Sequence, residues 1–170
     1  MTTKRVGAGM YVLALVALLG LLTVLFSDEL DRQKNPNQQP HVRFSEGIPE
    51  VALKRNRGGH YVVSGTINDA EATFLVDTGA TDVAVGEDLA RRAGLYFGQP
   101  VTVSTANGRT QAYTTVISRV TIGPIEAHNV EGAIVPNLGS EVLLGMSFLR
   151  RLDFLQRADE LILRPSSEAN

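Results

Sequence analysis

The feature that most restricts the fold of this chain is an uncharged run near its N-terminus. The 21 residues from Val6 to Phe26 read VGAGMYVLALVALLGLLTVLF. A helix rises about 1.5 Å per residue, so this run spans roughly 30 Å, the thickness of the hydrocarbon core of a bilayer. Lys4 and Arg5 precede the run and acidic residues follow it. Because basic residues tend to stay in the cytoplasm, we expect a single-pass membrane anchor over residues 1–27, with its N-terminus cytoplasmic and the remaining chain outside the cytoplasm.

A cleaved signal peptide and a buried core helix are the alternatives to an anchor. A cleaved signal peptide usually has an apolar region of about 7–15 residues that ends at a small-x-small cleavage site. This run is longer and ends in Leu25-Phe26-Ser27-Asp28-Glu29, which lacks that pattern. A buried core helix is disfavoured by the length and uniformity of the run. We therefore favour a retained anchor.

A polar segment separates the apolar run from the rest of the chain. Residues 28–45 are rich in Asn and Gln and are interrupted by Pro36 and Pro40. Such a composition is typical of a linker without fixed structure. We expect a flexible linker over 28–45, one soluble domain over 46–165 and a short tail over 166–170.

The overall composition argues against several classes of function. The net charge is −2 and the isoelectric point is near 5.9, so there is no electrostatic reason to expect nucleic-acid binding. The absence of cysteine excludes disulfides, thiol catalysis and Cys-ligated metals. The histidines, His41, His60 and His128, are far apart and show no zinc-ligand spacing. No metal site is predicted.

From Gly47 onward the pattern is one of short apolar runs separated by turns. Residues 60–67 and 70–76 flank Asn68-Asp69 and predict a hairpin, and residues 101–106 and 109–122 flank Asn107-Gly108, the strongest short hairpin signal. Further strands are expected at 81–85, 127–135, 141–145 and 161–165, and short helices at 86–94 and around 146–151. This pattern predicts an all-β, small, closed barrel-like domain with one or two short helices, preceded by one transmembrane helix.

A carboxylate without an evident partner stands at the end of one of these apolar runs. Phe74 to Thr81 read FLVDTGAT, so that Asp77 follows three apolar residues and precedes small ones. Charges seldom end a buried strand unpaired. A structural turn, in which the carboxylate bonds its own backbone, is the plain alternative to a catalytic role.

FLVDTGAT resembles the active-site loop of aspartic proteases, and a second segment strengthens the likeness. Residues 142–149, VLLGMSFL, resemble the apolar-apolar-Gly stretch and short helix that support this loop in that family, and Gly145 lies 68 positions after Asp77. The Asn107-Gly108 hairpin lies where the family carries its flap. Over roughly residues 50–165 the chain is similar to bacterial, membrane-anchored, retropepsin-like proteases of clan AA with a single Asp-Thr-Gly motif.

The chemistry of an aspartic protease needs two carboxylates. One carboxylate cannot both accept a proton from water and donate one to the leaving amine, whereas two close carboxylates share one proton. This chain has one such motif, because Asp82 and Asp153 lack the following hydroxyl and glycine. The partner must then be Asp77 of a second copy, which predicts a homodimer with its two-fold axis between the two aspartates.

The resemblance also implies roles for other residues. Asp77 is the expected catalytic residue, Thr78 bonds across the dimer to position the loops, and Gly79 and Ala80 leave room for a substrate backbone. The substrate-proximal residues are expected to be Thr81, Asp82, Ala106, Asn107 and Gly108, and the core residues that support the loop are Leu143, Leu144 and Gly145. Tyr113 is not assigned to the flap tip, and no metal or organic cofactor is implied.

The function implied is that of an aspartic endopeptidase anchored in a bacterial inner membrane, with its catalytic domain in the periplasm. Its substrate would be an extended peptide or protein segment. Two alternatives on the same fold remain open, namely a non-catalytic peptide-binding module and a dimerising scaffold.

Overall fold

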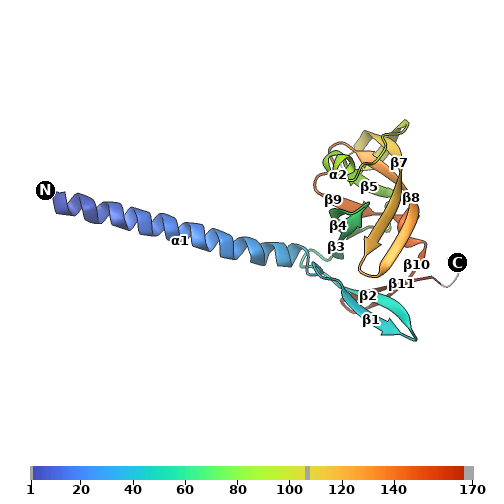
Figure 1. Cartoon of the computed structure of the whole chain (residues 1–170), viewed down its shortest axis with the longest axis horizontal. Helices are drawn as coiled ribbons and strands as arrows, with labels where there is room; N and C mark the ends of the chain where they lie inside the picture. Colours follow the sequence, from blue (N-terminus) through green and yellow to red (C-terminus); the bar gives the residue numbers. More distant parts are fainter. Residues whose placement is uncertain (1, 106–107, 167–170) are drawn as a thin grey trace.

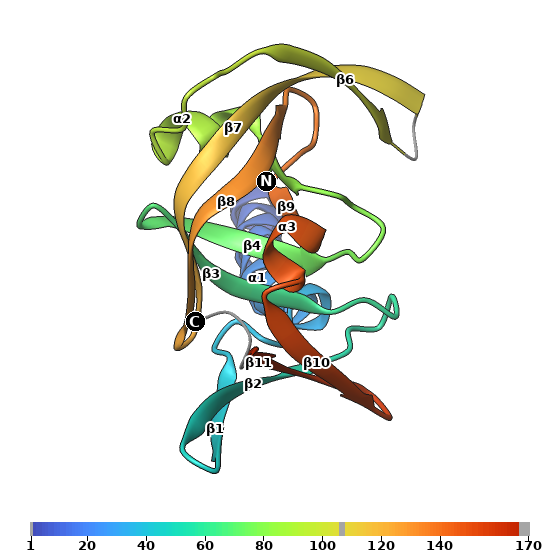
Figure 2. The same cartoon turned by 90° about the vertical axis from the view of Figure 1, so that its right-hand side faces the viewer.

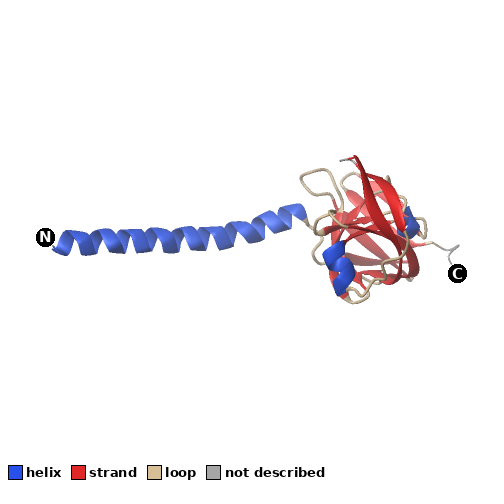
Figure 3. Ribbon diagram, turned by 90° about the horizontal axis from the view of Figure 1, so that it is seen from above, coloured by secondary structure: helices blue, strands red, loops and turns tan. Residues whose placement is uncertain are grey.

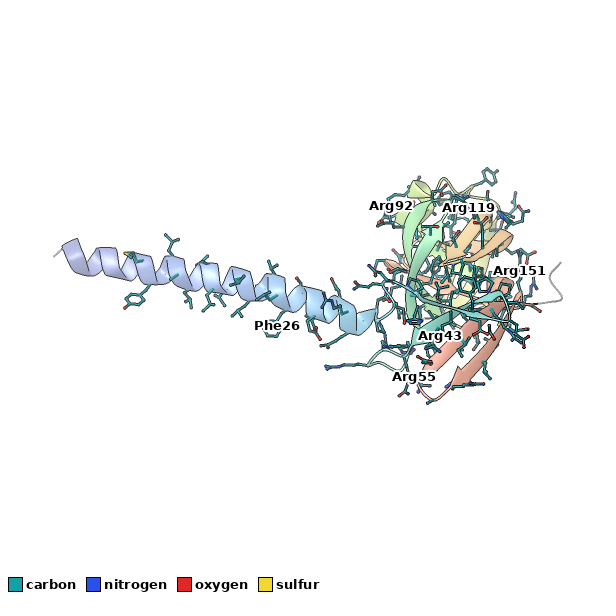
Figure 4. All side chains as sticks on the ribbon, turned by 60° about the horizontal axis from the view of Figure 1, so that its bottom comes forward. Phe26, Arg43, Arg55, Arg92, Arg119 and Arg151 are labelled. Atoms are coloured by element: carbon teal, nitrogen blue, oxygen red, sulfur yellow. The ribbon has the colours of Figure 1, made fainter. Side chains whose placement is uncertain are left out.

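The computed structural model describes residues 2–105 and 108–166, which form a long helix joined to a β domain (Figure 1). Helix α1 (Thr2–Lys34) extends away from the domain. Between Gly9 and Lys34, the most apolar window of 18 residues has a mean hydropathy of 2.5, and none of this window is buried. Figure 4 shows Phe26 projecting from α1 into the surroundings. By length and composition, this helix could cross a membrane.

Strands make up the body of the domain, and two short helices lie on its outside (Figure 3). The helices are α2 (Glu87–Arg92) and α3 (Met146–Leu149). In chain order the strands are β1 (His41–Ser45), β2 (Ile48–Lys54), β3 (Val62–Ile67), β4 (Ala70–Val76), β5 (Val83–Gly86), β6 (Pro100–Thr105), β7 (Gly108–Ile122), β8 (Ile125–Val135), β9 (Glu141–Leu144), β10 (Leu152–Arg157) and β11 (Glu160–Pro165). The predicted all-β class with short helices is confirmed.

The strands are arranged in two sheets. The larger has the order β3-β4-β9-β5-β8-β7-β6, and β3 also pairs with β7 through Thr66–Thr121 and Ile67–Val120. Six of its strands therefore form a ring, from which β6 extends as the outer strand of a hairpin. The smaller sheet has the order β1-β2-β11-β10. The domain is thus barrel-like, but the second sheet and the added strand make it less regular than a simple closed barrel.

The core fills this ring and the space between it and the smaller sheet. Aromatic and branched side chains from most of the strands and from α3 are fully buried there; the largest are Phe74, Phe148, Leu53, Ile67, Ile117, Ile122, Ile125, Ile134, Leu144, Leu149 and Leu163. Burial of a side chain of this size stabilises the fold by about 1.5–3 kcal/mol before entropy is counted. β4 and β9, which lead into the candidate site, are thus tied to the core by Phe74 and Leu144.

Two of the local signals, the Asn68-Asp69 turn and the glycine after the first short helix of the domain, are confirmed. Asn68 and Asp69 join β3 to β4 with φ values of 45° and 72°, both positive as a two-residue hairpin turn of this kind needs. Helix α2 is followed by Gly94 with φ of 64°, the left-handed conformation that ends many helices.

The segment 28–45, predicted to be a flexible linker, is ordered instead. Helix α1 continues to Lys34 and β1 begins at His41. Between them Asn37 is buried: its side-chain amide donates to the carbonyls of Lys54 at 2.9 Å and Val62 at 2.7 Å and accepts from the amide of Lys54 at 2.7 Å. The prediction was wrong because the polar composition serves to satisfy strand backbone groups. The division of the chain at residues 27, 45 and 165 stays a prediction.

Candidate active site

The loop that carries Asp77 leaves the ring where two parallel strands end. β4 pairs with β9 up to Val76 and Leu144. The Val76 amide donates to the carbonyl of Tyr61 at 2.9 Å, and the Asp77 amide donates to the carbonyl of Leu144 at 3.2 Å. The backbone of Asp77 is therefore fixed by the neighbouring strand, as expected for an apolar strand that delivers a loop to a defined place.

The carboxylate of Asp77 is held by its own loop. Its Oδ1 accepts a hydrogen bond from the amide of Gly79 at 2.9 Å, and the Ala80 amide donates to the Asp77 carbonyl at 3.2 Å. The side chain is half-buried, whereas Thr78 and Gly79 are exposed. No basic side chain in the described part of the chain forms an ion pair with this carboxylate. The loop therefore presents an oriented acid at the surface of one copy.

Helix α3 supports the second half of the loop. The amides of Met146 and Ser147 each donate at 2.8 Å, to the carbonyls of Ala80 and Thr81. These are amides of the first helical turn, which have no partner within the helix. Gly145 permits the contact, since a Cβ at this position would collide with the carbonyl of Asp82. The Asp77 loop is thus in direct contact with the Leu143-Leu144-Gly145 segment. Both were predicted to belong to the site, although they are distant in sequence.

Ser147 is a supporting residue to which the sequence analysis assigned no role. Its side chain is 2% exposed. Its hydroxyl donates to the carbonyl of Glu131 at 2.7 Å and accepts from the amide of Val83 at 3.1 Å, so it links α3, β8 and the start of β5. The available signal was a single hydroxyl inside the apolar run VLLGMSFL. A polar group at a core position needs partners, and here the partners are backbone groups that flank the loop.

A small apolar cluster joins the strand that follows the loop to the β6–β7 hairpin. Ala84, directly after the loop, pairs with Leu143 across β5 and β9, and both side chains are half-exposed. Ala84 also belongs to a small cluster under the hairpin, whose other members are Val101, Val103, Ala112, Ala133, Val135 and Leu138. Through Ala84, the strand that follows the loop is therefore packed against the β6–β7 hairpin.

The β6–β7 hairpin is present where the sequence predicts a flap. β6 and β7 pair up to Thr105 and Gly108, and Gly108 has φ of 107°. Two of the predicted substrate-proximal residues, Ala106 and Asn107, lie outside the described residues. The ring of Tyr113 packs edge-to-face on the ring of Phe97, with the two ring centroids 5.6 Å apart. This is a structural contact that lies away from the hairpin tip.

The remaining predicted residues have defined places. Thr81 is exposed and Asp82 half-buried in the loop, while Leu144 and Gly145 are buried. A hollow of about 690 Å³ lies against β3 and β4 near Ser64 and includes no residue of the loop. Within residues 2–105 and 108–166, no cluster of His, Asp and Glu could hold a metal ion.

A family model and a solved structure that match this chain are both of aspartic proteases. The family model described as "gag-polyprotein putative aspartyl protease" matches residues 63–151. The crystal structure of a retropepsin-like aspartic protease from Rickettsia conorii superposes with a TM-score of 0.59 at 32% sequence identity, over 75% of this chain and 96% of that chain.

Two curated bacterial relatives are uncharacterized proteins. One, from the cobV 5′ region of Sinorhizobium sp., is 41% identical over 76% of this chain and 58% of its own length. The other, from Rickettsia prowazekii (strain Madrid E), is 30% identical over 73% of this chain and 54% of its own length. The chain therefore spans little more than half the length of either relative.

Proposed function

Because this chain belongs to the retropepsin-like aspartic proteases, we propose that it is an endopeptidase in which Asp77 forms one half of a catalytic dyad. The observation that carries this proposal is that the Asp77 carboxylate is held in a defined orientation without a charged partner in the described part of the chain. It is oriented by the Gly79 amide at 2.9 Å and forms no ion pair within the described chain. A single oriented carboxylate fits one half of a symmetric site.

The second half of the site is Asp77 of another copy. In the assembled dyad one carboxyl is ionised and the other protonated. The ionised carboxylate accepts a proton from water as the water oxygen attacks the peptide carbonyl carbon, and the protonated carboxyl hydrogen-bonds the carbonyl oxygen. The tetrahedral intermediate then collapses as a proton passes to the amide nitrogen and the C–N bond breaks. The products are a carboxylic acid and an amine.

Residues around Asp77 position the loop and the substrate. Thr78, exposed next to Asp77, bonds across the two-fold axis, and Gly79 and Ala80 leave space for a substrate main chain. The peptide lies extended between the loop and the β6–β7 hairpin, close to Thr81 and Asp82. The β6–β7 hairpin, including Gly108, covers it and excludes water. The reaction needs no metal or organic cofactor.

The proposed location is a bacterial inner membrane. Helix α1 would cross it once, with its N-terminus in the cytoplasm and the β domain in the periplasm. The length and apolar composition of α1 support this arrangement, and the relatives named above are bacterial proteins. Anchoring confines both copies to one surface, which raises their effective concentration and favours a dimer.

The test is cleavage of an unfolded protein by the full chain in lipid vesicles, at mildly acidic and neutral pH. We expect fragments from the wild type and none from Asp77→Asn, which removes the proton acceptor. Asp159→Asn is the matched control, because the side chain of Asp159 is 88% exposed in the β10–β11 turn. Cleavage by Asp77→Asn at the wild-type rate would refute the proposal, and peptide binding without cleavage would indicate a binding module.

A further inference from the structure

The side of the domain that faces α1 carries a polar recess. In Figure 2 α1 is seen nearly end-on behind β3 and β4, so a membrane crossed by α1 would lie roughly parallel to the outer face of these strands. Two adjoining hollows, of about 690 and 460 Å³, lie on this face and share Gln38, Ser64, Thr73 and Ser140. Their volumes are in the range of sites that bind small molecules. Together these hollows form the α1-side recess.

The end of α1 forms one wall of the recess and is held in place by hydrogen bonds. The carbonyl of Lys34, which lines the recess, accepts from the side-chain amide of Asn56 at 2.9 Å. The side-chain amide of Asn35 donates to the Ser64 hydroxyl at 2.9 Å, and the Ser64 amide donates to the Asn37 carbonyl at 3.2 Å. The wall formed by α1 is therefore fixed against β3, and the recess has a defined shape.

Charged side chains of both signs line the recess. The acids are Asp31, Glu71 and Glu141, and the bases are Lys34 and Arg92. Within the described chain none of the five forms an ion pair. Charges of opposite sign that line one recess without pairing can be satisfied by a ligand that carries both signs.

The acids and the bases approach the recess from different elements. Thr73 pairs with Glu141 across β4 and β9, and Glu71 lies two positions before Thr73, so the side chains of all three share the outer face of the sheet. Arg92, at the end of α2, lines the same hollow as Glu71. Figure 4 shows Arg92 on the side of the domain that faces α1. A ligand in the recess would thus meet carboxylates on the strands and cations at the ends of the two helices.

The recess lies near the level of the lipid headgroups if α1 spans the membrane. Phe26 ends the apolar run, and Asp31 and Lys34 follow it by five and eight positions. At about 1.5 Å per residue, they stand roughly 8 and 12 Å beyond the hydrocarbon core. The headgroup layer is about 5–8 Å thick on each side of a bilayer. The outermost groups of a lipid beside α1 can therefore reach the recess.

We propose that the α1-side recess binds the headgroup of a phospholipid that carries a phosphate and a primary ammonium group. The phosphate meets Arg92 and Lys34, and the ammonium donates hydrogen bonds to the carboxylates of Glu71 and Glu141. The inference rests on the proposed function in one respect, namely that α1 crosses a membrane.

The chemistry of the recess distinguishes between headgroups. A trimethylated ammonium has no N–H to donate, so phosphatidylcholine satisfies the carboxylates less well than phosphatidylethanolamine does. Phosphatidylglycerol has no ammonium and brings a net negative charge to a recess in which acids outnumber bases. Like charges disfavour that contact. The recess should therefore select phosphatidylethanolamine over both.

Lipid selectivity is measured on the full chain carrying Asp77→Asn, which keeps proteolysis out of the measurement. The protein is reconstituted in vesicles of phosphatidylethanolamine mixed equally with phosphatidylcholine, and in a second set with phosphatidylglycerol. It is extracted in mild detergent, and the lipids that stay bound are identified by native mass spectrometry. We expect phosphatidylethanolamine to be retained about tenfold or more over either competitor, because its ammonium forms charge-assisted hydrogen bonds.

Two pairs of substitutions separate the two halves of the headgroup. Glu71→Gln with Glu141→Gln keeps the shape of the recess but removes both charges, so the preference over phosphatidylcholine should fall to about one. Arg92→Gln with Lys34→Gln should lower the retention of both lipids, since both carry a phosphate, and should leave the preference in place. Asp159→Asn is the control, because this side chain is 88% exposed in the β10–β11 turn and does not line the recess.

The outcomes separate this inference from the proposed function. Equal retention of the lipids, or a preference that survives Glu71→Gln with Glu141→Gln, would overturn it. So would a preference for phosphatidylglycerol, which would indicate a contact with anionic lipid through Arg92 and Lys34 alone. A chain that does not float with the vesicles would refute the membrane anchor and the headgroup site together. Each of these results leaves an Asp77-dependent protease activity standing, and the expected selectivity in a chain that never cleaves a substrate would support the headgroup site and refute the protease.

Discussion

The amide nitrogen of Met146 lies 2.8 Å from the carbonyl oxygen of Ala80 and donates a hydrogen bond to it. The Ser147 amide bonds the Thr81 carbonyl in the same way. The first turn of α3 therefore uses amides that have no partner in the helix to fix the loop that follows Asp77. The position of the Asp77 carboxylate then depends on β9 and α3 as much as on its own strand, β4.

Gly145→Ala should displace this loop. A Cβ at position 145 would collide with the carbonyl of Asp82 and would approach that of Ala80, and both are backbone atoms that cannot swing away. Overpacking of this kind costs about 1–3 kcal/mol. We expect the free energy of unfolding, measured by urea denaturation, to fall by that amount and proteolysis to fall at least tenfold.

Gly58→Ala provides the control for this prediction. A Cβ at Gly58 would meet only the tips of the Asn56 and His60 side chains, both at 3.3 Å. This substitution should change unfolding and proteolysis little. Equal losses from the two substitutions would mean that the close approach of Gly145 to the loop does not position the site.

Ser147→Ala should weaken the link between α3 and β5. The change leaves the Glu131 carbonyl and the Val83 amide without the hydroxyl that each bonds, at 2.7 and 3.1 Å. Unpaired buried polar groups cost about 1–3 kcal/mol, so the urea midpoint should fall accordingly. Ser118→Ala on the exposed part of β7 is the control. A midpoint unchanged in Ser147→Ala would show that water or backbone movement replaces the hydroxyl.

The parts of the fold predicted from sequence are those with local causes. Asn68-Asp69 can adopt positive φ values, so the turn between β3 and β4 was predicted at the correct residues, although β3 begins at Val62 and not at residue 60. The apolar runs of the ring were found in the same way. Strands β1, β2 and β10 were not predicted. All residues of β1 are exposed, and so are all residues of β10 after the first, so these two strands lack the alternation that marks a half-buried strand.

The candidate site was predicted by its motif and not by its packing. FLVDTGAT pointed to Asp77, and VLLG pointed to the supporting segment with Gly145. The bonds of Ser147 could not be predicted, since its partners are backbone groups at residues 83 and 131. The same reason explains the error over residues 28–45: Asn37 is ordered by Lys54 and Val62, which are 17 and 25 positions away.

Asn37→Asp should detach the segment between the helix and the domain. The carboxylate keeps the oxygen that accepts from the Lys54 amide but loses the two N–H donors, and it places a negative charge against the carbonyls of Lys54 and Val62. Burying such an unpaired charge costs several kcal/mol. We expect a lower Tm and faster cleavage of residues 35–45 by an added protease. Gln39→Glu, an exposed amide-to-acid change nearby, should behave as the wild type does.

The number of aspartates in one active site can be counted by mixing. Wild-type chains and Asp77→Asn chains are combined at constant total concentration and allowed to exchange subunits in detergent, and the rate of peptide cleavage is measured. If each site needs Asp77 from two copies, only dimers of two wild-type chains are active. An equal mixture should then show about a quarter of the activity of wild-type protein alone at the same total concentration. A site complete within one chain would retain about half. A linear fall in rate with the fraction of Asp77→Asn would therefore rule out the shared dyad, even if Asp77 itself proved essential.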